Sequence, residues 1–463
     1  MNVLLIVSDS LRADYLDCYG SSWVKTPKID KLAGDSILFS ECYAASFPTG
    51  PMRQDLHSGR YTFTYTSWGD DWDPRHDLMA ELFRKGGYST SMITDTPSNR
   101  SYRRGFEHFE MIPGQVGLGG EVDTSGVLDL PAEVRKLRVP VSRFYGIAQA
   151  RSNWRGEEDR FAAQTMRASA RWLESSYGGD RPFFLLSDTF DPHEPWDPPR
   201  YYIDRYDPGY RGDELFEPAY EPSGYATEEE IRHMRCMYAG EVSMVDRWVG
   251  HLLTSLAEMG LDEETAVVLT SDHGFYHGEH GFIGKVQLDR EGRIIRRWPL
   301  YRTIAQIPLI IRVPGAGHGV ADGFCQPPDL LPTLLELAGL DVPGHVQGRS
   351  LVQDLKGRGK GWDEAITSLT YRQDSEVRSP TSFRNRRSLY VYGGDEWQSE
   401  YYDLTRDPEE MSNCIRERES DARDCHEKML DFLERVGCPA PVLELRRDFN
   451  PEPRKKLPVK RVL

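Results

Sequence analysis

Cysteine is scarce in this 463-residue sequence, and the cysteines that are present form no recognisable pattern. There are seven of them, an odd number, and no two have the CxxC spacing of metal-binding or redox pairs. Scattered cysteines of this kind argue against a disulfide framework and against a zinc ribbon. We therefore expect reduced thiols, as in a cytoplasmic protein.

Long apolar runs and an excess of positive charge are lacking as well. No hydrophobic stretch approaches the roughly 20 residues of a membrane-spanning helix. The apolar run that starts at Asn2 has no basic segment before it and leads straight into charged sequence, so we expect no signal peptide. The formal charge of −16 argues against a protein that binds nucleic acid or anionic membranes. A small anionic substrate would need local cations or a metal ion.

The sequence does contain recurrent short apolar runs that are typical of buried strands. They span residues 3–7, 183–186, 266–269 and 308–313. Helical patterns lie between them, and the clearest is an apolar stripe from Tyr238 to Leu256 with steps of three and four residues. This alternation predicts an α/β fold with a large, mainly parallel sheet flanked by helices.

Polar side chains follow several of the predicted strands. Asp9 comes after the first, and Asp272 and His273 follow the run at 266–269. Thr94, Asp95 and the segment 188–193 occupy the same position after other strands. Ligands of open α/β sheets bind beyond the carboxyl ends of the strands, so these residues are candidates for one site, although acidic residues after strands are also ordinary loop formers.

The chain divides into three predicted parts. Residues 1–364 are expected to form the catalytic α/β domain, with a glycine-rich insertion at about 111–156. Residues 365–445 are expected to form a C-terminal subdomain with a small antiparallel sheet and a helix. Residues 446–463 form a basic, proline-broken tail, which we interpret either as a solvated end or as an arm that joins copies into a homo-oligomer.

Two segments carry most of the chemical information. The first, "SFPTGPMRQDLHSGRY", starts at Ser46 and indicates either an ordinary turn or a helix start that presents Thr49 as a nucleophile. The second, "LTSDHGFYHGEHGFIGK", pairs Asp272 with His273 and returns His280 and Lys285 a few residues later. Its four glycines allow the backbone to wind closely around a metal site.

In combination with Asp9, these segments resemble the sulfatase branch of the alkaline phosphatase superfamily over nearly the whole chain. Relatives carry a nucleophile followed by x-P-x-R and later by T-G-R, and the stretch from Thr49 to Arg53 fits this, with Ser58-Gly59-Arg60 in register. A rival alignment makes Ser46 the nucleophile, but it puts Gly50 at the arginine position. Further matches are "FDPHEP" around His193 and "GEHGFIGK" with Lys285.

The departures from the sulfatase pattern change the implied function. Threonine cannot become the formylglycine aldehyde that sulfatases make from cysteine or serine. The family's "GKWH" segment is absent, Thr94 and Asp95 stand in its place, and we expect Asp95 to repel a second anion. His273 replaces the usual asparagine. The pattern therefore looks more like that of phosphonate monoester hydrolases and phosphodiesterases of the same superfamily. Threonine is the nucleophile in the nucleotide pyrophosphatase/phosphodiesterase and phosphoethanolamine transferase branches of that superfamily.

The resemblance implies a set of roles. Asp9, Thr49, Asp272 and His273 would bind one divalent metal ion, with Mn²⁺ or Zn²⁺ favoured over Ca²⁺ because of the imidazole ligand. Thr49, Arg53, His193 and Lys285 would be catalytic, and Thr94 and His280 would contact the substrate. Asp188, Asp191, His193 and His280 are the candidates for a second ion. The alternatives are a sulfatase with an unusual nucleophile, a transferase, and a sulfatase-like binding protein without activity.

Overall fold

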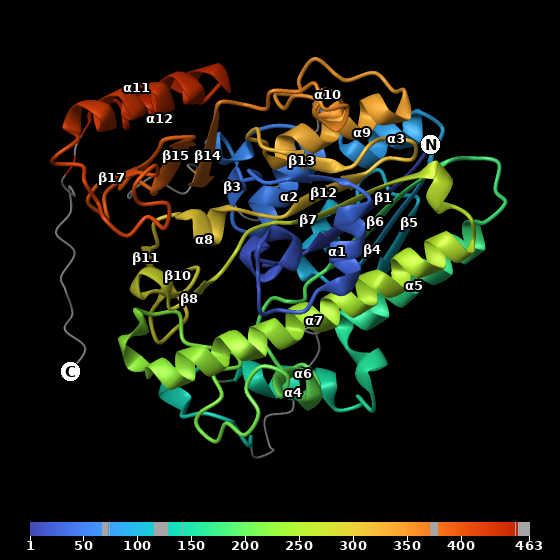
Figure 1. Ribbon diagram of the computed structural model, residues 1–463, viewed down its shortest axis with the longest axis horizontal. Helices are drawn as coiled ribbons and strands as arrows, with labels where there is room; N and C mark the ends of the chain where they lie inside the picture. The colour runs from blue at the N-terminus through green and yellow to red at the C-terminus, as the bar shows by residue number, and fades with distance from the viewer. Residues whose placement is uncertain are drawn as a thin grey trace.

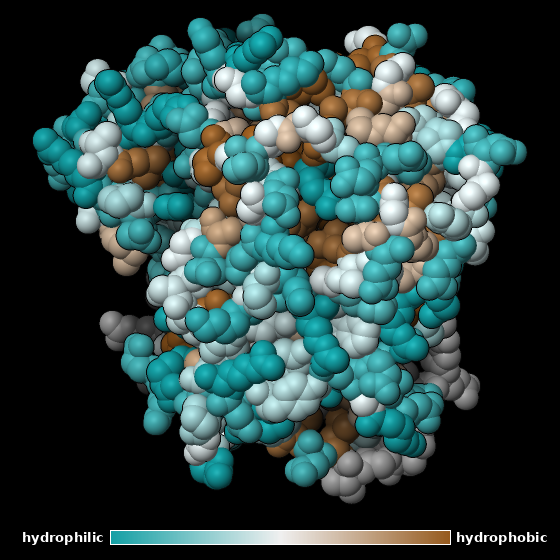
Figure 2. Space-filling model, turned by 45° about the vertical axis from the view of Figure 1, so that its right-hand side comes forward, coloured by the Kyte–Doolittle hydropathy of each residue, from teal (hydrophilic) through white to brown (hydrophobic). Residues whose placement is uncertain are grey.

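The fold is known from a computed structural model that describes residues 1–66, 73, 75–114, 128–140, 142–370, 378–449 and 451. Parts of the predicted insertion (115–127 and 141) and most of the basic tail (450 and 452–463) lie outside the described residues, so the predicted oligomer arm stays a prediction. No helix in the described ranges is long and apolar enough to span a bilayer. The face drawn in Figure 2 is mostly hydrophilic, with hydrophobic residues in small groups.

An eight-stranded sheet forms the centre of the molecule (Figure 1). Five neighbouring strands run parallel in the order β7-β1-β6-β4-β5, and β12 pairs antiparallel with β7 and β2 before β13 completes the edge. The bounds are β1 Asn2–Ser8, β2 Ile37–Phe39, β4 Ser89–Thr94, β5 His108–Met111, β6 Phe183–Thr189, β7 Thr265–Ser271, β12 Leu309–Arg312 and β13 Gly319–Ala321. The expected large, mainly parallel sheet is confirmed, and the predicted strand at 308–313 is the antiparallel β12.

Helices cover both faces of this sheet because its central strands bury both of their faces. Alternate residues of β1 belong to two different cores: Leu4 and Ile6 to one, Val3, Leu5 and Val7 to the other. The first core includes residues of α1 Pro27–Gly34, α5 Phe161–Ser176 and α7 Glu228–Glu258. The second includes residues of α2 Thr49–Ser58, α3 Met79–Lys85 and α9 Leu330–Ala338. The helix predicted from the stripe at 238–256 lies within α7, which begins ten residues earlier.

A second sheet of five strands lies at one end of the molecule, beneath α11 (Figure 1). Its order is β17-β16-β15-β14-β3. The bounds are β3 Ser46–Phe47, β14 Glu364–Leu369, β15 Thr381–Asn385, β16 Ser388–Tyr392, β17 Glu400–Asp403, α11 Glu419–Arg435 and α12 Ala440–Glu444. Because β3 pairs with β14, this sheet directly supports the strand that leads into Thr49.

Shorter elements complete the described chain. They are α4 Arg143–Arg151, α6 Arg200–Ile203, α8 Arg302–Ala305, α10 Val352–Leu355, β8 Tyr276–His277, β9 Ile283–Gly284, β10 Val286–Leu288 and β11 Ile294–Arg297. The antiparallel pair β10–β11 begins directly after Lys285 and matters for the site described below.

Candidate active site

The parallel pairing of β1 with β7 brings three potential metal ligands together. Ser8 lies opposite Ser271 in the register, so Asp9 and Asp272 leave the sheet side by side. The Ser10 amide donates to Asp272 Oδ1 at 2.8 Å. One ligand atom from each of Asp9, Asp272 and His273 lies within 4.8 Å of the others, and all three side chains are fully buried. No other cluster of three such ligands occurs among the described residues.

The electrostatics of this cluster suit a divalent cation. Burial, and then the neighbouring Asp272 carboxylate, raise the pKa of Asp9 well above its usual value. Burial lowers the pKa of His273 to about 4, which keeps the imidazole in the neutral form that ligates metals. His273 Nδ1 donates to the Gly274 carbonyl at 2.8 Å, so the lone pair of the neutral ring is on Nε2. Two adjacent carboxylates and an oriented imidazole fit a bound metal ion.

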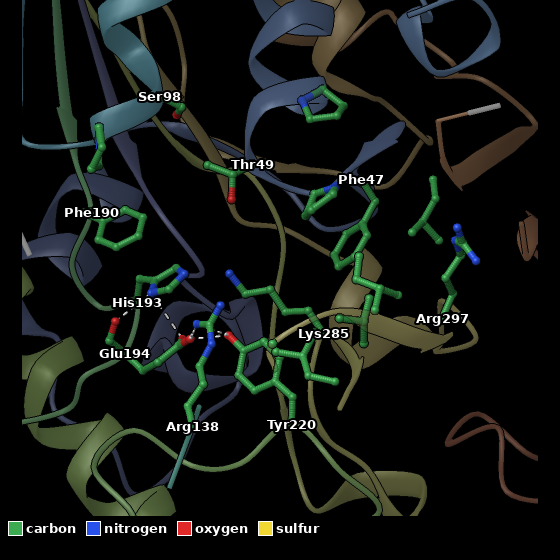
Figure 3. Close-up of a pocket in the computed structure, with 18 of the residues that line it drawn as sticks. Phe47, Thr49, Ser98, Arg138, Phe190, His193, Glu194, Tyr220, Lys285 and Arg297 are labelled. Atoms are coloured by element: carbon green, nitrogen blue, oxygen red, sulfur yellow. Dashed lines mark hydrogen bonds and ion pairs between the residues drawn. The ribbon is translucent and has the colours of Figure 1, made fainter. Parts of the chain in front are cut away.

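Thr49 lies directly beside this cluster. It is the first residue of α2, and its Oγ1 is 3.2 Å from His273 Nε2. Figure 3 shows its side chain pointing into a cavity whose lining it helps to form. Ser46 lies elsewhere: its hydroxyl donates to Asp55 at 2.8 Å, accepts from the Phe63 amide, and does not line the cavity. The geometry therefore favours Thr49 over Ser46 as the nucleophile.

Arg53 connects α2 to three strand ends. Its guanidinium donates twice to Asp188, at 2.8 and 2.9 Å, and once to Asp272 at 2.8 Å. It also lies 3.3 Å from Asp9 and donates to the Thr49 carbonyl at 3.3 Å. Arg53 is fully buried and does not line the cavity. It is thus arranged to position the carboxylates and the first turn of α2 rather than to touch a substrate.

The cavity above Thr49 has a volume of about 570 Å³ and includes His193 and Lys285 in its wall. Lys285 is 7% exposed and makes no hydrogen bond or ion pair within the described part of the chain. His193 stacks on Phe190 with a centroid distance of 4.0 Å, and its Nδ1 donates to the Glu194 carbonyl at 2.7 Å. Burial, and then Lys285, lower the pKa of His193 well below its usual value, so the ring is neutral near pH 7.

Two of the predicted substrate contacts lie away from this cavity. The Thr94 hydroxyl accepts from the Thr96 amide and from Asn99. His280 stacks on Tyr301 at a centroid distance of 4.1 Å. Neither residue lines the cavity. Sequence position relative to a strand end or a motif did not reveal these local partners.

The expectation that Asp95 repels a second anion is wrong. Its carboxyl is fully buried and accepts hydrogen bonds from Thr165 and from the Phe190 amide. Burial, and then the charge of Asp191, raise its pKa to about 8. The group is therefore largely uncharged at neutral pH and does not face the cavity.

Residues that sequence reasoning passed over also form the site. The Glu194 carboxylate accepts from Arg138 Nη1 at 2.6 Å and from the Tyr220 hydroxyl, and it contacts His193 Nδ1 at 3.2 Å (Figure 3). Glu194 is 1% exposed, and Arg138 and Tyr220 line the cavity with it. The only sequence signal was the charged residue that directly follows His193 within "FDPHEP".

Asp55 supports the turn before Thr49, and its removal should destabilise the protein. Its fully buried carboxylate accepts from the amide and hydroxyl of Ser46 and from the amide and hydroxyl of Thr62. Asp55→Ala would leave these buried donors without an acceptor, so we expect a loss of about 3–5 kcal/mol of unfolding free energy. Urea denaturation would measure it, with Asp341→Ala, at an exposed position, as the control. A loss below about 1 kcal/mol would contradict this role.

Comparisons with known proteins show the family to which the chain belongs. The model of the family described as Sulfatase matches residues 1–340, and a model described as N-sulphoglucosamine sulphohydrolase, C-terminal, matches 291–436. An N-acetylglucosamine-6-O-sulfatase from Bacteroides thetaiotaomicron is 25% identical over 90% of this chain and 83% of its own. A multifunctional alkaline phosphatase superfamily protein, PehA, from Trinickia caryophylli is 26% identical over 89% of this chain and 90% of its own.

Solved structures share the fold. The phosphonate monoester hydrolase of Agrobacterium radiobacter superimposes with a TM-score of 0.73 and 23% identity, covering 94% of this chain and 96% of that one. The large mixed sheet flanked by helices, with its added C-terminal unit, is thus the alkaline phosphatase/sulfatase fold.

Proposed function

We propose that this chain, which belongs to the sulfatase family, is a metal-dependent hydrolase that cleaves phosphodiesters or phosphonate monoesters through a covalent intermediate on Thr49. The observation that carries the proposal is the position of a threonine hydroxyl, 3.2 Å from His273, at the floor of the cavity. A threonine cannot be converted to the formylglycine aldehyde, whereas its hydroxyl can attack phosphorus directly.

The groups around Thr49 support a two-step displacement. In the first step Thr49 gives up its hydroxyl proton to solvent and its Oγ forms a bond to phosphorus, while the bond from phosphorus to the leaving oxygen breaks and that oxygen takes up a proton. In the second step water attacks phosphorus and frees Thr49. Held by Asp9, Asp272 and His273, a divalent ion would lower the pKa of the Thr49 hydroxyl; Mn²⁺ or Zn²⁺ suits this ligand set better than Ca²⁺.

Lys285 and His193 are suited to different parts of this reaction. Lys285 makes no hydrogen bond or ion pair within the described chain, so its ammonium group can bind a non-bridging oxygen or protonate the leaving group. The lowered pKa of His193 keeps its ring neutral, and Nδ1 is committed to the Glu194 carbonyl. Nε2 is therefore an acceptor, which suits a base for the attacking water.

The balance of charge in the cavity favours a substrate group with one negative charge. Each of the three cavity arginines pairs with a carboxylate: Arg138 with Glu194 at 2.6 Å, Arg143 with Glu217 at 2.6 Å, and Arg297 with Glu396 at 2.9 Å. Within the described lining this leaves Lys285 as the one cation without a paired carboxylate.

The layer beneath the cavity leads to the same conclusion. It contains three carboxylates, Asp9, Asp188 and Asp272, and one guanidinium, Arg53. The charge of this layer is balanced when one divalent ion is bound. With Lys285, the whole site then has about one positive charge to offer, which matches the single charge of a phosphodiester, a phosphonate monoester or a sulfate ester better than the double charge of a phosphate monoester.

A sulfatase with an unusual nucleophile is the second candidate, because the curated relatives are mostly named sulfatases. The two candidate activities are distinguished by comparing kcat/KM for 4-nitrophenyl phenylphosphonate and 4-nitrophenyl sulfate. These substrates have the same leaving group and the same single negative charge. We expect the phosphonate to be cleaved at least about 10-fold faster, because Thr49 offers an alkoxide and no aldehyde hydrate. Faster cleavage of the sulfate would reverse the assignment.

A further inference from the structure

Apolar side chains contribute most of the surface of the cavity wall, although the wall also contains polar residues besides Thr49, His193 and Lys285, namely Ser98, Arg138, Arg143, Glu194, Tyr220, Arg297 and Thr370. Apolar side chains from six separate segments of the chain contribute to it. They include Phe47, Pro48, Pro51, Pro97, Ile147, Phe190, Pro195, Val286, Leu288, Ile294 and Leu369. A phosphoryl or sulfuryl group fills only a small part of about 570 Å³, and cavities of this size commonly hold drug-sized ligands. Most of the space is therefore available to the organic part of the substrate.

The hairpin β10–β11 supplies one side of this wall. It follows Lys285 directly, and Val286, Leu288, Gly292 and Ile294 line the cavity from it. A Cβ added at Gly292 would lie 3.4 Å from the Val139 carbonyl oxygen, so the hairpin tip lies against the segment that carries Arg138. The tip of the hairpin thus contacts the segment next to Arg138, and the hairpin closes the cavity between Lys285 and Arg138.

Ile294 is unusual within this hairpin because it is large, apolar and 52% exposed. It lines the cavity, so a bound group would cover apolar surface that water now contacts. Its neighbour Ile295 is 47% exposed but does not line the cavity. The two residues therefore form a matched pair, alike in size and exposure, of which one faces the site.

The charged groups of the wall that could bind sugar hydroxyls are mostly paired with one another, whereas the Ser98 hydroxyl in the lining makes no hydrogen bond to a described residue. Arg138, Arg143 and Arg297 pair with Glu194, Glu217 and Glu396, and the Tyr220 hydroxyl donates to Glu194. A sugar ring carries several hydroxyl groups, and each loses free energy when it is buried without a hydrogen-bond partner. An aromatic or branched hydrocarbon group has no such requirement and gains from apolar contact.

We propose that the organic group of the substrate is an uncharged hydrophobic one, an aromatic ring system or a branched hydrocarbon, bound against the β10–β11 hairpin with Ile294 as a specificity-determining residue. This inference rests on the proposed function only in taking the substrate to be an ester with one negative charge. The inference about the organic group is the same whether the enzyme attacks phosphorus or sulfur.

Sulfonates test this inference on the intact enzyme because they are not hydrolysed and carry one charge. Titration calorimetry would compare 2-naphthalenesulfonate, methanesulfonate and 6-deoxy-6-sulfoglucose with the wild-type protein. We expect the naphthalene compound to bind about 100-fold more tightly than methanesulfonate, from the apolar area it buries. The sugar sulfonate should bind no more tightly than methanesulfonate. Binding of the sugar as tight as that of the naphthalene compound would overturn the proposal.

Substitutions of Ile294 and Ile295 then test where the hydrophobic group of the ligand binds. Ile294→Asp should weaken 2-naphthalenesulfonate binding at least about 10-fold and change methanesulfonate binding less than about 2-fold. Ile295→Asp should leave both unchanged, and thermal unfolding checks that the two variants are equally folded. Equal effects of the two substitutions would overturn the role of Ile294. Because binding is measured without turnover, failure of the Thr49 mechanism would not affect this result.

Discussion

Thr49→Ala should lower kcat by about 10³-fold or more, while Thr49→Ser should retain measurable turnover. Alanine removes the hydroxyl that forms the covalent bond, and among the described residues no other hydroxyl hydrogen-bonds to His273 Nε2, which lies 3.2 Å from Thr49 Oγ1. Serine keeps the hydroxyl and loses only the methyl group that helps to orient it. Steady-state kinetics with a 4-nitrophenyl ester would measure the effect. The control is Ser98→Ala, which removes a different hydroxyl from the cavity lining and should change kcat less than about 10-fold.

The covalent step has a direct readout as well. Acid quenching during turnover, followed by peptide mass spectrometry, should find the phosphoryl group with its retained substituent on Thr49. The neighbouring hydroxyls of Ser46 and Thr62 are held by Asp55 and should carry no adduct. An active Thr49→Ala enzyme, or an adduct on Ser46, would show that the nucleophile has been misassigned.

The second large effect is expected at the metal site. The double substitution Asp272→Ala/His273→Ala removes two of the three clustered ligands, so the purified protein should lose its divalent ion and kcat should fall by about 10³-fold. Elemental analysis provides a readout that does not depend on activity. Wild-type protein should contain one ion per chain, and dialysis against a chelator should remove the ion and the activity together.

His280→Ala is the matched control for this experiment. His280 belongs to the same segment as His273 but stacks on Tyr301, away from the cluster. Its substitution should leave the metal content unchanged. Full metal occupancy in the Asp272→Ala/His273→Ala protein, or loss of metal in His280→Ala, would refute the assignment of the ligands.

The sequence by itself was enough to predict the α/β class and the residues that meet at the strand ends. Asp9 and Asp272 each follow a short apolar run, and parallel strands deliver their carboxyl ends to one edge. The register of the nucleophile motif favoured Thr49 over Ser46 because a motif is a property of spacing along the chain, and of the two only Thr49 lines the cavity. In all these cases the information was local, or required only that neighbouring strands be parallel.

The tertiary structure decided the direction of the side chains that follow a strand or belong to a motif. Thr94 and Asp95 follow a strand as Asp9 does, yet their side chains turn to Asn99 and Thr165, and His280 turns to Tyr301. Thr165 and Tyr301 are distant in sequence and are brought near by packing between helices and loops, which no spacing reveals, whereas Asn99 is a local partner in the loop that follows Thr94. The cavity wall was hidden for the same reason, because Phe47, Ile147, Ile294 and Leu369 are distant in sequence and meet only when the β10–β11 hairpin, α4 and the C-terminal sheet assemble around Thr49.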